Sequence, residues 1–261
     1  MTQKTVANTQ VLPADRSIVT LQAVDVSFWV RARRSILKAR WPVLALVVLL
    51  SIVALALVGP EIAPKDPNRQ TLVKRLLPPF AENAQGEIEF ILGTDALGRD
   101  VLSRLIYGAR ISLMVGFAAV AICGVMGTSL GLIAGYYGGL IGNVIMRIAD
   151  IQLAFPFILL AIMVLVVLGP GVLNLVLVLG IGQWVTYARI ARGETMSQRE
   201  KEYVEAAHSM GMSNWRIMFR TILPNILAPL IVIASFNVAS VILAEASLSF
   251  LGLGVPPSVP T

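Results

Sequence analysis

Few residues in this chain have the types and spacing that catalysis requires. His208 is the only histidine and Cys123 the only cysteine, so the sequence holds neither a multi-histidine metal site nor an intrachain disulfide. Ser247 and Ser249 have no histidine nearby in sequence that could act as a base. The chain also has no G-x-x-x-x-G-K-[ST] loop to hold the phosphates of a nucleotide. We therefore predict no catalytic residue, no metal, no cofactor and no ATP hydrolysis by this chain itself.

Glu245 is the one acidic residue inside a long apolar run, residues 226–251. A charged side chain at mid-membrane costs roughly 3 kcal/mol even on insertion scales, so it is expected to face protein or water rather than lipid. Two interpretations stay open: a structural contact between helices, or a place in a translocation path.

The composition is that of a membrane protein. Of 261 residues, 56% are hydrophobic and 14% charged, and the mean hydropathy is +0.78. A soluble domain is nearer half apolar and one quarter charged. The net charge of +6 comes from basic residues that flank the apolar runs, where they meet anionic lipid headgroups. We therefore exclude a soluble globular protein and expect no nucleic-acid partner.

Five apolar runs are long enough to be membrane-spanning helices, because about 20 apolar residues cross the roughly 30 Å of hydrocarbon in a bilayer. They cover residues 41–58, 111–134, 151–168, 172–187 and 226–251.

These runs divide the chain into four parts. We predict a cytoplasmic tail over residues 1–40, a first transmembrane helix over 41–59, an extracytoplasmic segment over 60–110, partly helical near its end, and a transmembrane core over 111–261. Within the core, the charged loop 189–224 is expected in the cytoplasm. Basic residues before the first run and in that loop place the N-terminus in the cytoplasm, although arginines ahead of the second run favour the opposite orientation. A secretory signal peptide is the alternative for the first run, but the long stretch before it argues against one.

Small residues and prolines predict how the spans pack and bend. Gly127, Gly131 and Gly135 recur every four residues, so they share one helical face and would let two backbones approach closely in lipid. The alternative is a flexible, glycine-rich helix end. Pro156 removes a backbone hydrogen bond within the third run and predicts a kink there.

The charged loop has the start and stop signals of two short helices. Residues 200–210 can form one helix, Gly211 can end it in the left-handed conformation, and Ser213 can start a second helix as its N-cap. Pro224 should then interrupt the chain before the last span. Two short helices at an angle, held off the membrane, would form a rigid knob for a partner's groove. An amphipathic loop lying on lipid is the simpler alternative.

The same loop resembles the E-A-A-x-x-x-G-x(9)-I-x-L-P loop of permease subunits in ATP-binding-cassette (ABC) importers. The motif positions are held by Glu205, Ala206, Ala207, Gly211, Leu223 and Pro224. Thr221 stands where isoleucine is usual. Residues 93–104 are similar to the G-T-D-x-x-G-R-D-x-x-S-R segment of the C-type permease in dipeptide, oligopeptide and nickel importers. Residues 245–254 resemble the family's closing E-A-x-L-S-F-L-G-L-G segment, and the three motifs appear in family order.

The resemblance implies an all-α integral membrane protein with the type I ABC importer transmembrane fold, multi-pass in the bacterial cytoplasmic membrane. Permeases of this kind usually have a sixth span, which we expect beyond Thr261 in addition to the five predicted here. The resemblance also implies that the six motif residues dock an ATPase subunit.

The partners implied are a second homologous permease, two cytoplasmic ATP-binding subunits and a periplasmic or lipid-anchored substrate-binding protein. Dipeptides, oligopeptides, nickel chelates, glutathione and opines all stay open as substrates. The competing classes are a secondary transporter or channel, for which Glu245 and Pro156 are the only midplane signals, and a membrane-bound enzyme.

Overall fold

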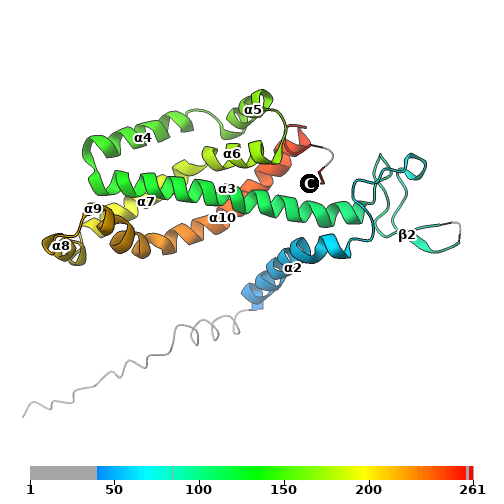
Figure 1. Ribbon diagram of the computed structural model, residues 1–261, viewed down its shortest axis with the longest axis horizontal. Coiled ribbons are helices and arrows are strands. Elements are labelled where there is room, and N and C mark those ends of the chain that lie inside the picture. The colour runs from blue at the N-terminus through cyan, green and yellow to red at the C-terminus, as the bar shows by residue number, and fades with distance from the viewer. Residues whose placement is uncertain (1–39, 84, 257–258, 261) are drawn as a thin grey trace, which may run out of the picture. The chain divides into compact units, whose positions relative to one another are not determined.

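The computed structural model describes residues 40–83, 85–256 and 259–260. The predicted tail, apart from its last residue, lies outside them. The chain divides into two compact units, Met1–Val48 and Leu49–Thr261. The described part of the first unit is the start of helix α2, and the remaining elements belong to the second unit (Figure 1).

Helix α2, Arg40–Ile62, contains the first predicted span. Its segment Val43–Ile62 has a mean hydropathy of 2.8, and 20 helical residues at 1.5 Å each match the thickness of the hydrocarbon. Pro60 lies in the last turn of α2.

Residues 63–100 are here called the cap, and their described part, 63–83 and 85–100, contains no α-helix. They contain the 3₁₀ turn η1, Leu72–Lys74, and the antiparallel strands β1, Ala81–Glu82, and β2, Ile88–Phe90. No sequence pattern predicted this hairpin. Its turn is held by Asn83, whose Oδ1 accepts the backbone N–H groups of Gln85 at 2.9 Å and Glu87 at 3.0 Å.

Helix α3, Val101–Tyr137, is 37 residues long. Asp100 is its N-cap, and the Asp100 carboxylate accepts the backbone N–H of Ser103 at 2.8 Å. At 1.5 Å per residue the helix measures about 55 Å, well beyond the hydrocarbon thickness. The charge-free run 111–134 is therefore only the middle of this helix.

The third predicted span is broken rather than kinked. Helices α4, Gly139–Leu153, and α5, Phe157–Leu168, meet at a bend of 83°. Pro156 is the N-cap of α5, and the residues just before it leave the helix. The prediction of a kink underestimated this change, because proline both lacks an N–H and disfavours the helical conformation in the residue before it.

Helices α6, Val172–Gly182, and α7, Trp184–Arg199, form the fourth candidate span. Helix α7 continues to Arg199, so the beginning of the predicted loop 189–224 is helical.

The rest of that loop contains helix α8, Glu202–Ser209, the short helix α9, Asn214–Arg216, and the π-helical segment η2, Ile217–Ile222. Helix α10, Leu223–Phe250, follows without a break, and Asn214–Phe250 counts as one candidate span. The prediction that Pro224 interrupts the chain was wrong. Pro224 lies in the first turn of α10, where its missing N–H is tolerated, and the wide π-helical turn before it lets the helix continue.

By length and composition, four described helices can cross a membrane, and the bent pair α4–α5 makes a fifth if it counts as one span. Five spans were predicted. Helix α3 is the centre of the packing, with α4, α6, α7 and α10 against it (Figure 1). Fully buried side chains in this core include Val115, Leu132 and Leu179.

Candidate functional site

The candidate site is a knob, defined here as residues 200–216, which follows α7. Two acidic residues, Glu202 and Glu205, lie in the first turn of α8, where they complement the positive end of the helix. Gly211 has φ +75°, and its N–H donates to the carbonyl of His208 at 2.9 Å. The N–H of Met212 donates to the carbonyl of Ala207 at 3.1 Å, which completes a Schellman motif. The predicted left-handed end of the helix is confirmed.

Ser213 is the N-cap of α9, as predicted from its position, with φ −66° and ψ 145°. Its side chain makes no capping hydrogen bond. The second limb of the knob is therefore held by other contacts.

The six motif residues do not share one surface. Glu205, Ala206 and Gly211 are exposed on the knob, whereas Ala207 is 3% exposed and, with Val204, forms the buried side of α8 next to η2. The other two, half-buried Leu223 and exposed Pro224, lie in the first turn of α10. The motif thus combines contact positions with a packing position.

Two large apolar side chains on the knob were not singled out from the sequence. Met210 is 74% exposed and Trp215 64% exposed, and the Trp215 ring lies 4.1 Å from that of Phe219. Exposed apolar side chains in a charged segment are typical of a protein interface, in which methionine and aromatic residues are enriched. Their apolar character within a charged loop was the available signal.

The last turn of α3 reaches the knob through Tyr136. Its hydroxyl donates to Oδ1 of Asn214 at 2.9 Å and lies 3.0 Å from Nε2 of His208. Arg199 Nη1 donates to the backbone carbonyl of Tyr136 at 2.6 Å. A cavity of about 470 Å³ lies beside these groups and is also lined by Glu205. Sequence reasoning missed Tyr136 because it lies 72 residues from His208 and outside every motif.

Gly127, Gly131 and Gly135 face α7. A Cβ on Gly135 would lie 2.7 Å from the carbonyl oxygen of Arg192, and Cβ atoms on the other two would meet the carbonyl oxygens of Trp184 and Ala188 even more closely. The two backbones are therefore in direct contact along this stripe, at distances that only glycine allows.

Glu245 is 1% exposed and lies between α10 and α3. Its Oε2 accepts a hydrogen bond from Ser112 of α3 at 2.9 Å, and its Oε1 accepts one from Ser249 at 2.8 Å. Both carboxylate oxygens thus have partners within the chain.

The G-T-D-x-x-G-R-D segment has a structural role in the cap. Gly93 and Gly98 have φ of +76° and +72°, and a Cβ on either would overlap a backbone carbonyl of residues 71–77. The Thr94 hydroxyl donates to the carbonyl of Lys74 at 2.5 Å and accepts the N–H of Leu77 at 2.9 Å. The segment therefore holds the first half of the cap in place.

Asp95 of the same segment organises the turn that leads to α3. Its carboxylate accepts the backbone N–H groups of Leu97 and Arg99 at 2.8 and 2.9 Å and pairs with Arg99 Nε at 2.7 Å. Partial burial acts to raise the pKa of Asp95, but the hydrogen bonds from Arg99 and Leu97 outweigh it, so the pKa lies below its usual range.

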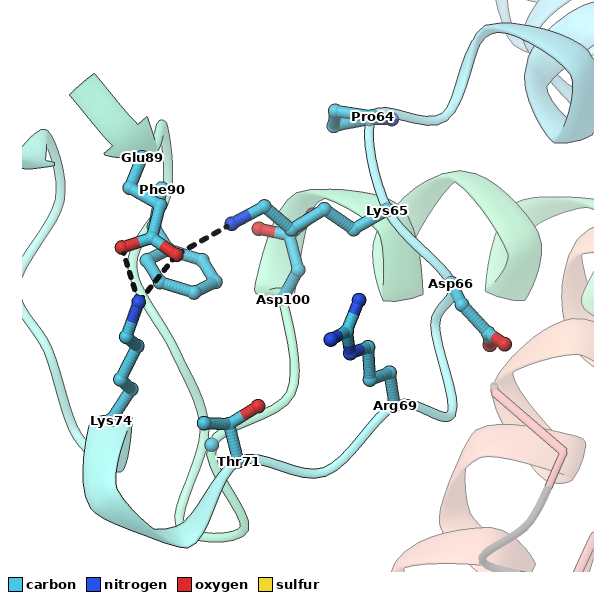
Figure 2. A pocket seen from close by; sticks show the side chains of 10 residues that line it. Pro64, Lys65, Asp66, Arg69, Thr71, Lys74, Glu89, Phe90 and Asp100 are labelled. Atoms are coloured by element: carbon cyan, nitrogen blue, oxygen red, sulfur yellow. Dashed lines mark hydrogen bonds and ion pairs between the residues drawn. The ribbon is translucent and has the colours of Figure 1, made fainter. Parts of the chain in front are cut away.

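A cavity of about 460 Å³ opens on the cap (Figure 2). Lys74 Nζ lies 2.7 Å from each oxygen of Glu89, and Lys65 Nζ lies 3.4 Å from Glu89 and 3.4 Å from the centre of the Phe90 ring. The hydrogen bond from Lys74 lowers the pKa of Glu89. In the view of Figure 2 the Arg69 side chain lies between the side chains of Asp100 and Asp66.

No group of three or more His, Cys, Asp or Glu residues that could hold a metal ion occurs in the described part of the chain. Ser129 stands in a G-x-S-x-G sequence but lies within α3, whereas a serine nucleophile of that motif needs a strand-to-helix turn.

Apolar helices packed around α3, with the cap before its first residue and the knob near its last, define the architecture of a multi-span helical membrane protein. A solved structure of the MetNI methionine ABC transporter in inward-facing conformations has the same fold, with a TM-score of 0.51 and 21% identity. The similarity covers 58% of this chain and 76% of that one.

The chain belongs to the binding-protein-dependent transport system inner membrane components, a family that matches residues 127–261. The N-terminal transmembrane domain of oligopeptide transport permease C matches residues 27–79. The chain is thus a C-type permease subunit of the ABC importer class and a multi-pass inner-membrane protein. This family membership argues against the two alternatives, a secondary transporter and a membrane-bound enzyme.

The names of similar proteins agree with this assignment. The dipeptide transport system permease DppC of Haemophilus influenzae is 42% identical over 85% of this chain and 75% of its own length. The di/tripeptide transport system permease DppC of Pseudomonas aeruginosa is 45% identical over 82% and 71%. The glutathione transport system permease GsiD of Pectobacterium atrosepticum is 46% identical over 65% and 56%.

Proposed function

We propose that this chain pairs with a second homologous permease to form the translocation path of an importer for small peptides, and that two separate ATP-binding subunits drive it by docking on the knob. The observation that carries the proposal is the knob itself. It is a folded, exposed corner whose Met210 and Trp215 side chains project from a charged segment.

The proposed topology has the N-terminus and the knob in the cytoplasm and the cap in the periplasm. Arg189, Arg199, Arg216 and Arg220 border or lie within the segment that carries the knob, as the positive-inside rule requires of cytoplasmic loops.

The structure offers a route by which docking would move the spans. Val204 and Ala207 of α8 are buried, and α8 lies against η2, which runs directly into α10. Helix α7 leads into α8 from the other side. A rigid body joined to two spans can bind its partner differently in two transporter states, which is the differential contact that coupling requires.

For the substrate we infer peptides of two or three residues. Support comes from relatives whose names specify dipeptides, di/tripeptides and glutathione, which is itself a tripeptide. A periplasmic or lipid-anchored substrate-binding protein would deliver the peptide to the cap side.

In this proposal Glu245 has a structural role, in which its hydrogen bonds hold α10 against α3, and it does not line the translocation path. Each of its oxygens accepts a hydrogen bond from a hydroxyl group of the same chain and the residue is buried, so the carboxylate is directed into the contact between α10 and α3.

The docking proposal is tested by charge reversal on the knob. The tagged chain is purified from its native membrane in mild detergent, and ATPase subunits are quantified by mass spectrometry. We expect Glu205→Lys to lose most of the ATPase subunits and dipeptide uptake. Glu82→Lys, an equal charge change on the exposed strand β1 of the cap, should recover the ATPase subunits at the native level. Full recovery and full uptake with Glu205→Lys would refute docking at this site.

A further inference from the structure

The two limbs of the knob meet α3 at a single side chain. Helix α8 ends near His208, α9 begins at Asn214, and the left-handed turn at Gly211 separates them. The hydroxyl of Tyr136 lies within hydrogen-bond distance of both limbs, 3.0 Å from His208 Nε2 and 2.9 Å from Asn214 Oδ1. No other side-chain hydrogen bond joins α3 to α8 or α9 among the residues that the structure describes.

Tyr136 is itself firmly held. It is 6% exposed, its ring stacks near the His208 ring at 6.1 Å between centroids, and Arg199 of α7 donates to its carbonyl at 2.6 Å. The side chain is buried and contacts α8 and α9, and the backbone of the same residue is held by α7, so the hydroxyl is a rigid reference point for the knob.

The direction of these bonds matches one tautomer of His208. A tyrosine hydroxyl carries one proton, which here is donated to Asn214. Its oxygen then accepts from His208 in the tautomer that carries the proton on Nε2.

We propose that Tyr136 is a positioning residue for energy coupling: its hydroxyl fixes the angle between the two limbs of the knob and ties that angle to α3. The inference rests on the proposed docking of ATPase subunits at the knob. Movement of the docked knob then reaches α3, and through the glycine stripe α7, as well as α10. Without the hydroxyl, the knob still binds its partner but transmits less of the movement.

The chain provides a matched pair of variants. Tyr136→Phe removes this hydroxyl, whereas Tyr137→Phe removes the hydroxyl of the next residue, which is 46% exposed and has no hydrogen bond to the knob. Both keep an aromatic ring, so the edge-to-face contact of the two rings is retained.

The first test reads the hydrogen bond directly. Because His208 is the only histidine, the full chain in lipid nanodiscs, ¹⁵N-labelled at histidine and carrying a tag without histidine, gives one imidazole signal set. We expect the protonated Nε2 resonance of the native chain to be unchanged by Tyr137→Phe and shifted by Tyr136→Phe at the same pH. Identical Nε2 signals in all three chains would overturn the contact.

The second test reads coupling in the complete complex, reconstituted into proteoliposomes with dipeptide as substrate. We expect Tyr136→Phe to retain its ATPase subunits while the peptide transported per ATP falls about five- to tenfold, as loss of one or two net hydrogen bonds implies. An unchanged ratio would overturn the proposal. If the native chain recovers no ATPase subunit, the docking function fails and the coupling role with it, whatever the NMR signal shows.

Discussion

At the scale of single residues, the knob depends on a backbone conformation that one glycine supplies. Gly211 lies in the left-handed region with open space around its missing Cβ, so its cost of replacement is conformational rather than steric. Gly193, in the middle of α7, also has nothing within 4 Å of the place that a Cβ would occupy, but its backbone conformation is helical. The two glycines therefore separate corner geometry from the general effect of adding a methyl group.

Gly211→Ala is expected to destabilise the corner by about 1 kcal/mol, because alanine is strained at positive φ. Gly193→Ala should be neutral or stabilising, since alanine favours a helix interior. Dipeptide uptake at equal membrane abundance measures the consequence, with a clear loss expected for Gly211→Ala alone. Equal uptake by the two variants would contradict a role for the corner.

The cap should respond to acid through Asp95. Its pKa in the folded protein is lowered, so the stability that it contributes is present above the unfolded pKa of about 3.9 and is lost as the pH falls through the folded value. Amide exchange of Leu97 and Arg99, corrected for intrinsic rates, should accelerate on acidification below about pH 4. Asp95→Asn should remove this pH dependence, and its persistence in that variant would assign the effect to another group.

At the scale of elements, the molecule is organised by the contact between α3 and α7. Three glycines bring the two backbones together, and lipid offers no hydrophobic driving force that would compensate for a gap. On the same helix, Gly124 lies one turn before Gly127, and a Cβ there would make an ordinary 3.6 Å contact with the Tyr187 ring. The stripe, not glycine content in general, sets the helix spacing.

Gly131→Ala should therefore destabilise the folded chain by about 1–3 kcal/mol, because the added methyl overlaps the Ala188 carbonyl and the backbone must move. Gly124→Ala should be within experimental error of the native protein. Thermal unfolding in detergent, followed by tryptophan fluorescence, checks both. Equal unfolding temperatures for the two variants would rule out close packing at the stripe.

The contact between α3 and α10 depends on Glu245. Glu245→Leu removes both of its hydrogen bonds and leaves the Ser112 hydroxyl without its acceptor, so we expect a loss of about 2–3 kcal/mol in stability. Ser247→Ala, which removes a hydroxyl that bonds only within α10, is the control and should have little effect.

Measurements of uptake distinguish the structural role of Glu245 from a path-lining role. If the role is structural, the Glu245→Leu protein, once folded, keeps its preference among dipeptides of different charge. A changed preference at unchanged stability would place Glu245 in the path instead.

At the scale of the whole molecule, the sequence was sufficient wherever a feature is local. Apolar runs predicted five spans, and Gly211 predicted the corner of the knob, because helix length and left-handed caps depend on neighbouring residues. The break at Pro156 was underestimated, since proline fixes where a helix fails but not how far the chain turns.

Features that depend on tertiary contacts escaped prediction. The role of Tyr136 requires α3 and the knob to be adjacent, which no local pattern reveals. The partition of the motif into exposed Glu205 and buried Ala207 likewise appears only when α8 is packed next to η2. Conversely, the G-T-D-x-x-G-R-D segment was recognised from the sequence, but its structural role, holding the first half of the cap in place, was not predicted.

Photo-crosslinking in the native membrane shows whether the ATPase subunits dock on the knob. A photoreactive residue replaces exposed Ala206 on α8, and the control replaces Val167, which is 82% exposed on the apolar helix α5. If the ATPase subunits dock on the knob, position 206 forms a crosslink to a protein that carries the Walker nucleotide-binding loop, and position 167 forms none. Crosslinks from position 206 to lipid alone would contradict docking and would place the loop on the membrane surface.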